Sequence, residues 1–371
     1  MSFPPTPPTD GQAAMEPIPL STLTASAAGV PPASRWRVLR SGCASTGWGL
    51  GVAVAVAVVA SALGRLVPIV GGPVFGIILG GALATVVPAS PRLAPGIAFA
   101  SKRVLQASIV VLGTGLSLPQ VLHAGRSSLL VMLGTLATAL GGAWVFGRVL
   151  KVGPDTCALI GVGTGICGAS AIAAVSAVIG AAEIDVAYAM GTIFAFNVVA
   201  VLLYPAIGHL LGLSQHAFGL WAGTAINDTS SVVAASYSYG AVAGSYAVVV
   251  KLTRSLMIIP VCVGVAYLRA RRTDGPEGKA VLPWRRMFPL FILGFLAASG
   301  LQSAGLIPAG WHGPLRTTAV FLITVALAGV GMSTRVRTLK TVGPRPLLLG
   351  AILWVAVGAS SLLLQLATGT L

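Results

Sequence analysis

The sequence has 371 residues, of which 56% are hydrophobic and only 8% are charged, and its mean hydropathy is +0.92. Because a soluble domain carries about 25% charged residues, this chain cannot cover a globular surface with polar groups. A formal net charge of +15 would favour a nucleic-acid partner in a soluble protein. Here Lys and Arg fall mostly between apolar stretches and form no basic stripe interleaved with aromatic residues. Composition and charge therefore predict a protein whose partner is the lipid bilayer, and no nucleic-acid partner.

The first 40 residues predict a disordered tail. They contain eight prolines and no apolar run long enough for the core of a signal peptide. Arg35, Arg37 and Arg40 stand just before the first apolar segment, and basic residues in that position hold a chain end in the cytoplasm. We therefore expect residues 1–40 to form a disordered cytoplasmic tail and residues 41–371 to form a transmembrane domain.

Apolar segments about 20 residues long, enough to cross a hydrocarbon core as helices, follow one another to the end of the chain. They lie at 45–64, 68–87, 99–117, 127–149, 155–181, 184–208, 214–239, 243–268, 287–306, 315–333 and 346–368. Most basic residues fall in alternate loops, whereas the other loops hold Arg65 and Arg126. This asymmetry predicts a cytoplasmic N-terminus and an external C-terminus. The predicted fold is all-α, a polytopic helical membrane protein of about 9–11 spans.

Two of these segments are interrupted at their centres. GTGICGASAIAA (163–174) and GTAINDTSSVVA (223–234) place Gly, Asn, Asp and Ser at mid-depth, and the two stretches share five of twelve residues. Broken helices inside a membrane are tolerated where they line a cavity or pack in protein, and paired breaks point to a transporter binding site. Each copy is either a re-entrant hairpin, giving nine spans, or a broken crossing helix, giving eleven.

A second, weaker sequence similarity is typical of inverted repeats. The stretch 113–117 (GTGLS) resembles the stretch 329–333 (GVGMS), and each closes an apolar span. An odd number of spans separates them under either geometry, so we expect the two spans to run antiparallel.

Three charged residues lie far from any segment end. Asp228 is at the centre of 214–239, and Lys251 and Arg254 interrupt 243–268 at a spacing that puts both on one helix face. A charge at mid-bilayer costs at least about 2.5–3.5 kcal/mol on insertion scales, so such residues face a cavity or a partner. A structural ion pair between Asp228 and one cation is the alternative, and it still leaves one cation over.

The charge count favours an anionic ligand. Two cations and one carboxylate leave one positive charge, and two half-helix N-termini near Ser170 and Ser230 would each add about half a charge. We therefore expect a site that is positive by roughly two units. Backbone N–H groups, hydroxyls and an Arg fork suit a small oxyanion.

The central motifs resemble a known family. GVGTGICGASAIAA (161–174), GTAINDTSSVVAAS (223–236) and KLTRSLMIIPV (251–261), with LGTGLSL (112–118) before them and AGVGMSTRV (328–336) after them, resemble the bacterial sulfate exporter family of inner-membrane proteins. The resemblance covers about residues 45–370. It implies a multi-pass protein of the bacterial inner membrane, related in fold to cation/proton antiporters and anion symporters built from inverted repeats.

One departure from that wider group concerns the mechanism. Its familiar proton antiporters place paired carboxylates in the crossing region, whereas here Cys167-Gly168 stands opposite Asn227-Asp228. A proton exchange on two carboxylates is therefore not expected. A uniporter, or an exchanger with one titrating carboxylate, stays open.

Cofactors, metals and enzymatic chemistry are not predicted. The four cysteines contain no CxxC pair, the four histidines lie near segment ends without metal-ligand spacing, and no Ser–His pair, HExxH motif or paired aspartates lie at depth. Self-association into a homo-oligomer stays open.

The sequence thus predicts a secondary transporter that exports a small oxyanion, such as sulfate or a sulfonate, by alternating access. The alternative is a cation- or proton-coupled antiporter that uses Asp228. The residues expected at the substrate site are Lys251, Arg254, Asp228, Asn227, Thr229, Ser230, Thr164 and Ser170.

Overall fold

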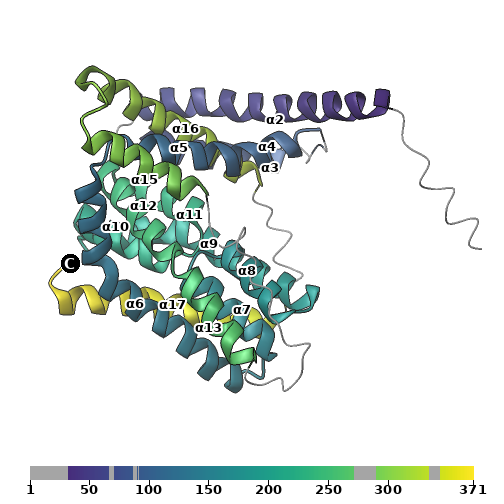
Figure 1. Ribbon diagram of the computed structural model, residues 1–371, viewed down its shortest axis with the longest axis vertical. Helices are drawn as coiled ribbons and strands as arrows, with labels where there is room; N and C mark the ends of the chain where they lie inside the picture. Colours follow the sequence, from purple (N-terminus) through teal and green to yellow (C-terminus); the bar gives the residue numbers. More distant parts are fainter. Residues whose placement is uncertain (1–31, 67–70, 87–89, 91, 271–289, 334–342) are drawn as a thin grey trace, which may run out of the picture. The chain divides into compact units, whose positions relative to one another are not determined.

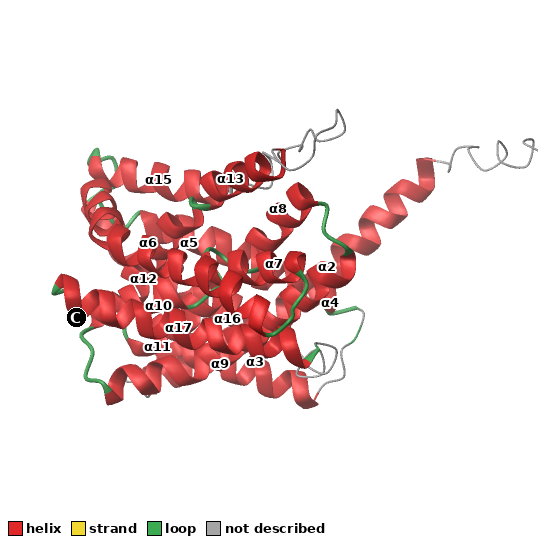
Figure 2. Cartoon of the chain, turned by 90° about the horizontal axis from the view of Figure 1, so that it is seen from below, coloured by secondary structure: helices red, strands yellow, loops and turns green. Residues whose placement is uncertain are grey.

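A computed structural model describes residues 32–66, 71–86, 90, 92–270, 290–333 and 343–371. All elements in these ranges are helices, as Figure 2 shows, and no strand occurs among them. The predicted all-α class is confirmed. The helices of the first half are α2 (Pro32–Leu66), α3 (Gly71–Val86), α4 (Ala94–Phe99), the π-helix η2 (Ala100–Val104), α5 (Leu105–Gly113), α6 (Leu118–Val149), α7 (Pro154–Gly165) and α8 (Ala169–Ile179). The others are α9 (Glu183–Leu210), α10 (Gln215–Ala225), α11 (Thr229–Tyr239), α12 (Ala241–Ser255), α13 (Ile258–Ala270), α15 (Leu290–Ser303), the 3₁₀ turn η4 (Ala309–Trp311), α16 (His312–Ser333) and α17 (Pro344–Thr368).

The chain divides into two units, Met1–Ala44 and Ser45–Leu371. Most of the expected tail, residues 1–31, lies outside the described residues. Residues 32–40 are described, and they form the first turns of α2 where the sequence predicted disorder. Pro32 suits a helix start because its fixed φ fits the first turn and its missing N–H is not needed there.

Seven helical segments are long and apolar enough to cross a membrane, and α3, α8 and α15 are shorter apolar helices. Every apolar segment predicted from the sequence contains a helix. The predicted class of polytopic helical membrane protein is therefore confirmed.

Close helix packing builds the bundle around α16. It packs along α3, where glycines allow the two backbones to approach. A Cβ on Gly80 would lie 2.3 Å from the Ala328 carbonyl oxygen, and one on Gly331 would lie 2.4 Å from the Ile77 carbonyl oxygen. The end of α16 also meets the start of the 94–113 span, because a Cβ on Gly329 would lie 3.2 Å from the Ile97 carbonyl oxygen. Those two spans therefore run antiparallel, as expected.

The helices α10 and α11 form a re-entrant hairpin. Gln215, at the start of α10, accepts the backbone N–H groups of Val242 at 3.0 Å and Ala243 at 3.2 Å, directly after α11. Tyr239, the last residue of α11, donates its hydroxyl to the Gly208 carbonyl at 3.2 Å. The start of α10 and the end of α11 therefore lie together, next to the C-terminal end of α9. Figure 1 shows α10, α11 and α12 grouped in one part of the bundle.

The helices α7 and α8 form a second hairpin at the other end of α9. Thr156, near the start of α7, donates its hydroxyl to the Asp185 carboxylate in the first turn of α9, just after α8. Further along, a Cβ on Gly163 of α7 would lie 2.9 Å from the Ile172 side chain of α8. The two helices therefore run antiparallel, with their open end at the start of α9.

These contacts decide between the two geometries that the sequence left open. The open ends of the two hairpins lie at opposite ends of α9. This helix has 28 residues and is about 42 Å long, which is enough to cross a membrane. With α7, α8, α10 and α11 in hairpins, the seven membrane-length segments and the shorter apolar helices α3 and α15 are left in the described chain as candidates for crossings. A common origin of the two hairpins as an inverted repeat stays a prediction.

Candidate functional site

The tip of the first hairpin is the turn between α7 and α8. Ile166 leaves the helical region at φ −124° and ψ −94°, and Gly168 turns the chain at φ +69°. Glycine adopts a positive φ without the steric cost that a Cβ would add. Gly168 is also the N-cap of α8 and supplies no side chain to the free N–H groups of the first turn. The N-cap position of α8 therefore supplies no anionic side chain to its amide end.

The tip of the second hairpin contains Asp228. Its backbone is extended, and its carboxylate accepts the backbone N–H of Ser230 at 2.9 Å as well as the Ser230 hydroxyl. Asp is a preferred N-cap because its oxygens pair with the free N–H groups of the first turn. Asp228 therefore caps α11.

Lys251 joins the two tips. Its Nζ donates to the Ile166 carbonyl at 2.7 Å and to the Ile226 carbonyl at 2.8 Å, and its side chain is fully buried. Both carbonyls belong to residues that follow the last turn of a half-helix, α7 in one case and α10 in the other. Since helix C-termini carry partial negative charge, one ammonium group stabilises both ends.

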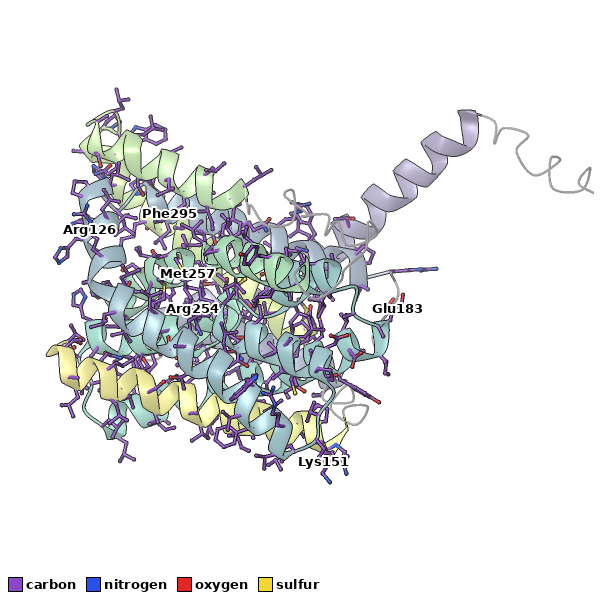
Figure 3. All side chains as sticks on the ribbon, turned by 60° about the horizontal axis from the view of Figure 1, so that its bottom comes forward. Arg126, Lys151, Glu183, Arg254, Met257 and Phe295 are labelled. Carbon is purple, nitrogen blue, oxygen red and sulfur yellow. The ribbon has the colours of Figure 1, made fainter. Side chains whose placement is uncertain are left out.

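Arg254 lies one turn further along α12 and holds the first tip. Its Nε donates to the Gly165 carbonyl at 2.7 Å and its Nη2 to the Thr164 carbonyl at 2.8 Å. The guanidinium is fully buried in the middle of the bundle (Figure 3), whereas Arg126, Lys151 and Glu183 lie at its edges. Its third nitrogen, Nη1, is buried without a hydrogen-bond partner among the described residues.

Sequence reasoning missed Asn197. This residue lies near the middle of α9 and is 3% exposed. Its Oδ1 accepts the backbone N–H of Asp228 at 3.2 Å, and its Nδ2 is left without a partner in the described part of the chain. The second tip therefore meets α9 near its midpoint, and the first tip lies close by, because a Cβ on Gly168 would lie 3.3 Å from the Ile193 side chain. An amide at the centre of a long apolar helix was the available signal.

Sequence reasoning also missed a third interruption. Helix α12 ends at Ser255 and α13 begins at Ile258, directly after Arg254. Pro260 explains the break, because it has no N–H to donate to the Leu256 carbonyl four residues earlier. Three helices therefore break around the same buried cations.

The predicted site residues gather here, but their roles differ from the expected ones. Lys251 and Arg254 bind backbone carbonyls, and one of these carbonyls belongs to Thr164, a residue that is 1% exposed. In the described chain Asp228 forms no ion pair with either cation; its carboxylate binds Ser230 instead. The structural ion pair is therefore not observed.

Of the remaining predicted residues, Ser170, Thr229 and Ser230 lie on the more open side of the tips, whereas Asn227 is buried. Ser170 is exposed, with its Oγ 2.8 Å from the Cys167 Sγ, and Thr229 and Ser230 are half-buried. Asn227 is 1% exposed, and its Oδ1 has no partner within the described ranges. These side chains provide hydroxyl and amide groups at the hairpin tips.

The geometry corrects the expected charge of the site. The sequence count included the positive amide ends of two half-helices, but α7 and α10 end at the same tips at which α8 and α11 begin. Two partial negative ends therefore offset two partial positive ends. Lys251, Arg254 and Asp228 leave a net charge of about one positive unit, not two.

Comparison of the sequence with known proteins identifies a family to which the chain is similar. A family model described as Conserved hypothetical protein 698 matches residues 48–350, which include both hairpins, Lys251 and Arg254. A UPF0324 membrane protein of Streptococcus pyogenes is 43% identical over 315 residues, which cover 83% of this chain and 93% of the relative. A UPF0324 membrane protein of Clostridium tetani is 38% identical over 326 residues, covering 84% and 94%. One of Streptococcus pneumoniae is 40% identical over 315 residues, covering 83% and 93%.

Proposed function

Since the chain belongs to the family of Conserved hypothetical protein 698, with relatives named as UPF0324 membrane proteins, we propose a function for its hairpin site: secondary transport of a small oxyanion by alternating access. Sulfate and sulfonates are the candidate substrates, and export across a bacterial inner membrane, with the N-terminus in the cytoplasm, is the proposed setting. The meeting of two re-entrant hairpins around buried cations carries this proposal.

Hairpins that enter from opposite ends suit alternating access. Each hairpin reaches the middle of the bundle from one end of α9, so a small movement of either one can open the shared tips to one face. Non-helical backbone at such depth is tolerated where protein or a water-lined cavity satisfies it. Lys251 satisfies carbonyls of both tips and so couples their positions.

The free polar groups suit an anion. Arg254 Nη1 and Asn197 Nδ2 are buried donors without partners in the described residues, and the N-cap of α8, Gly168, adds no anionic side chain to the first turn. Ser170, Thr229 and Ser230 add hydroxyls at the same level. With one net positive charge among these donors, an oxyanion is favoured and a bare cation is disfavoured.

An isosteric variant tests the anion site. Asn197→Asp keeps an oxygen that can accept the Asp228 N–H, removes the free Nδ2 donor and adds one negative charge, which cancels the net charge of the site. We expect purified protein in liposomes to transport labelled oxyanions, and the variant to transport them at least a hundredfold more slowly. Gln120→Glu is the matched control, because it makes the same chemical change at an exposed capping-box position where Glu also fits.

The outcomes separate transport from other roles. Absence of flux for every anion in a panel, with the protein correctly inserted, would contradict the transporter proposal. Unchanged flux in Asn197→Asp would show that the anion does not bind at the hairpin tips.

A cation- or proton-coupled antiporter is the second candidate. The half-buried carboxylate of Asp228, which has no cationic partner among the described residues, favours it. This candidate predicts transport of Na⁺ or H⁺ that is lost in Asp228→Asn, whereas the anion site predicts that anion binding persists in that variant.

A further inference from the structure

We propose that the transported anion carries a single negative charge, as a sulfonate does, and that doubly charged sulfate is a poor substrate. This inference rests on the proposed function and specifies the substrate class of the same site. It follows from the number and placement of the buried charges at the hairpin tips.

Four half-helix ends and three charged side chains meet at the tips. The carbonyl end of α7 binds Arg254 and Lys251, and the carbonyl end of α10 binds Lys251. The amide end of α11 binds the Asp228 carboxylate. Each of these ends therefore has a side chain of opposite charge.

The amide end of α8 is the one without a countercharge. Its N-cap is Gly168, which has no side chain to offer, whereas the matching position of the second hairpin is Asp228. A second observation points to a ligand at the hairpin tips. Arg254, which holds the carbonyls that precede this tip, is fully buried and keeps Nη1 unpaired among the described residues. The arrangement therefore lacks one anionic group at the hairpin tips.

Charge neutrality then sets the valence of the ligand. The half-helix ends offset one another, and the side chains leave one positive unit, so a monoanion neutralises the loaded site. A dianion would leave one uncompensated negative charge at mid-depth. On insertion scales the cost of such a charge corresponds to binding that is roughly a hundredfold weaker. Sulfate would therefore need a co-transported cation or proton, and a sulfonate would not.

Two tetrahedral sulfur oxyanions that differ in charge test this inference. Proteoliposomes are supplied with labelled methanesulfonate, which has one charge, or labelled sulfate, which has two, at the same concentration and ionic strength. We expect the wild-type protein to transport methanesulfonate at least tenfold faster than sulfate. Asp228→Asn raises the charge of the site to two, so the ratio should shift toward sulfate by at least tenfold.

The control variant is Glu183→Gln. It removes the same charge at an exposed position in the first turn of α9, at the edge of the bundle (Figure 3), and should leave the ratio unchanged. The ratio of methanesulfonate flux to sulfate flux in the wild-type protein tests the monoanion inference even if Asp228→Asn does not fold. Sulfate flux equal to or faster than methanesulfonate flux overturns the monoanion inference alone, and so does an unchanged ratio in a folded Asp228→Asn. Absence of flux for both anions overturns the proposed function, and this inference with it.

Discussion

Replacing Arg254 with Gln should destabilise the first hairpin as well as its ligand site. The guanidinium makes two charge-assisted hydrogen bonds, to the Gly165 carbonyl at 2.7 Å and the Thr164 carbonyl at 2.8 Å, in a fully buried position. Hydrogen bonds to charged groups contribute about 1.5–3 kcal/mol each, so the two together contribute about 3–6 kcal/mol. A total stability of about 5–15 kcal/mol is usual for a folded domain. The loss is therefore large on that scale.

The assay is thermal unfolding of purified protein in detergent, followed by intrinsic tryptophan fluorescence. Arg148→Gln is the matched control, because Arg148 makes one hydrogen bond at 3.3 Å to the Trp144 carbonyl and stacks on that ring. Exposed contacts of this kind contribute about 0.5–1 kcal/mol. We expect a much lower midpoint for Arg254→Gln and a midpoint close to wild type for Arg148→Gln. Equal midpoints for Arg254→Gln and wild type would refute the role of Arg254 in holding the α7 carbonyls.

Three further predictions concern the breaks and the open side of the site. Pro260→Ala restores a backbone donor and removes a helix penalty of about 3 kcal/mol, so transport should slow as α12 and α13 become continuous; Pro205→Ala, within the unbroken α9, should have little effect on flux. Gly168→Ala should impair transport, because its φ is +69° and its Cβ would lie 3.3 Å from Ile193, whereas Gly180→Ala at φ +61° has open space and should lose stability only. Ser170→Cys, in a protein without other cysteines, should react with a soluble thiol reagent more slowly when substrate is bound, and inertness under all conditions would place Ser170 away from the solute pathway.

The two interruptions illustrate how far local sequence reaches. The Gly-Thr and Asn-Asp-Thr-Ser stretches weaken a helix and favour turns and caps wherever they occur, so both breaks were predictable. The N-cap role of Asp228 was predictable for the same reason. Asn197 and Pro260 were missed although each has a local signal, a polar amide and a missing N–H within long apolar segments.

The cations show where local reasoning fails. Their depth and shared helix face follow from the sequence, but their acceptors do not. Lys251 binds a carbonyl 85 residues earlier, and Arg254 binds carbonyls 89 and 90 residues earlier. A buried cation needs acceptors, and the sequence offered Asp228 and a ligand as candidates. The backbone carbonyls of a broken helix were a third possibility that only the fold revealed.

By itself the sequence determined the membrane class, the apolar segments, both central breaks and the level of the buried charges, because hydropathy, helix propensity and capping act within a few residues. Tertiary structure decided that the broken segments turn back as hairpins, that they enter from opposite ends of α9, and that their carbonyl ends meet the buried cations. Those features arise from contacts between distant parts of the chain, such as Gln215 with Val242 and Thr156 with Asp185. The direction of a half-helix changes neither its composition nor its periodicity, so only packing fixes it.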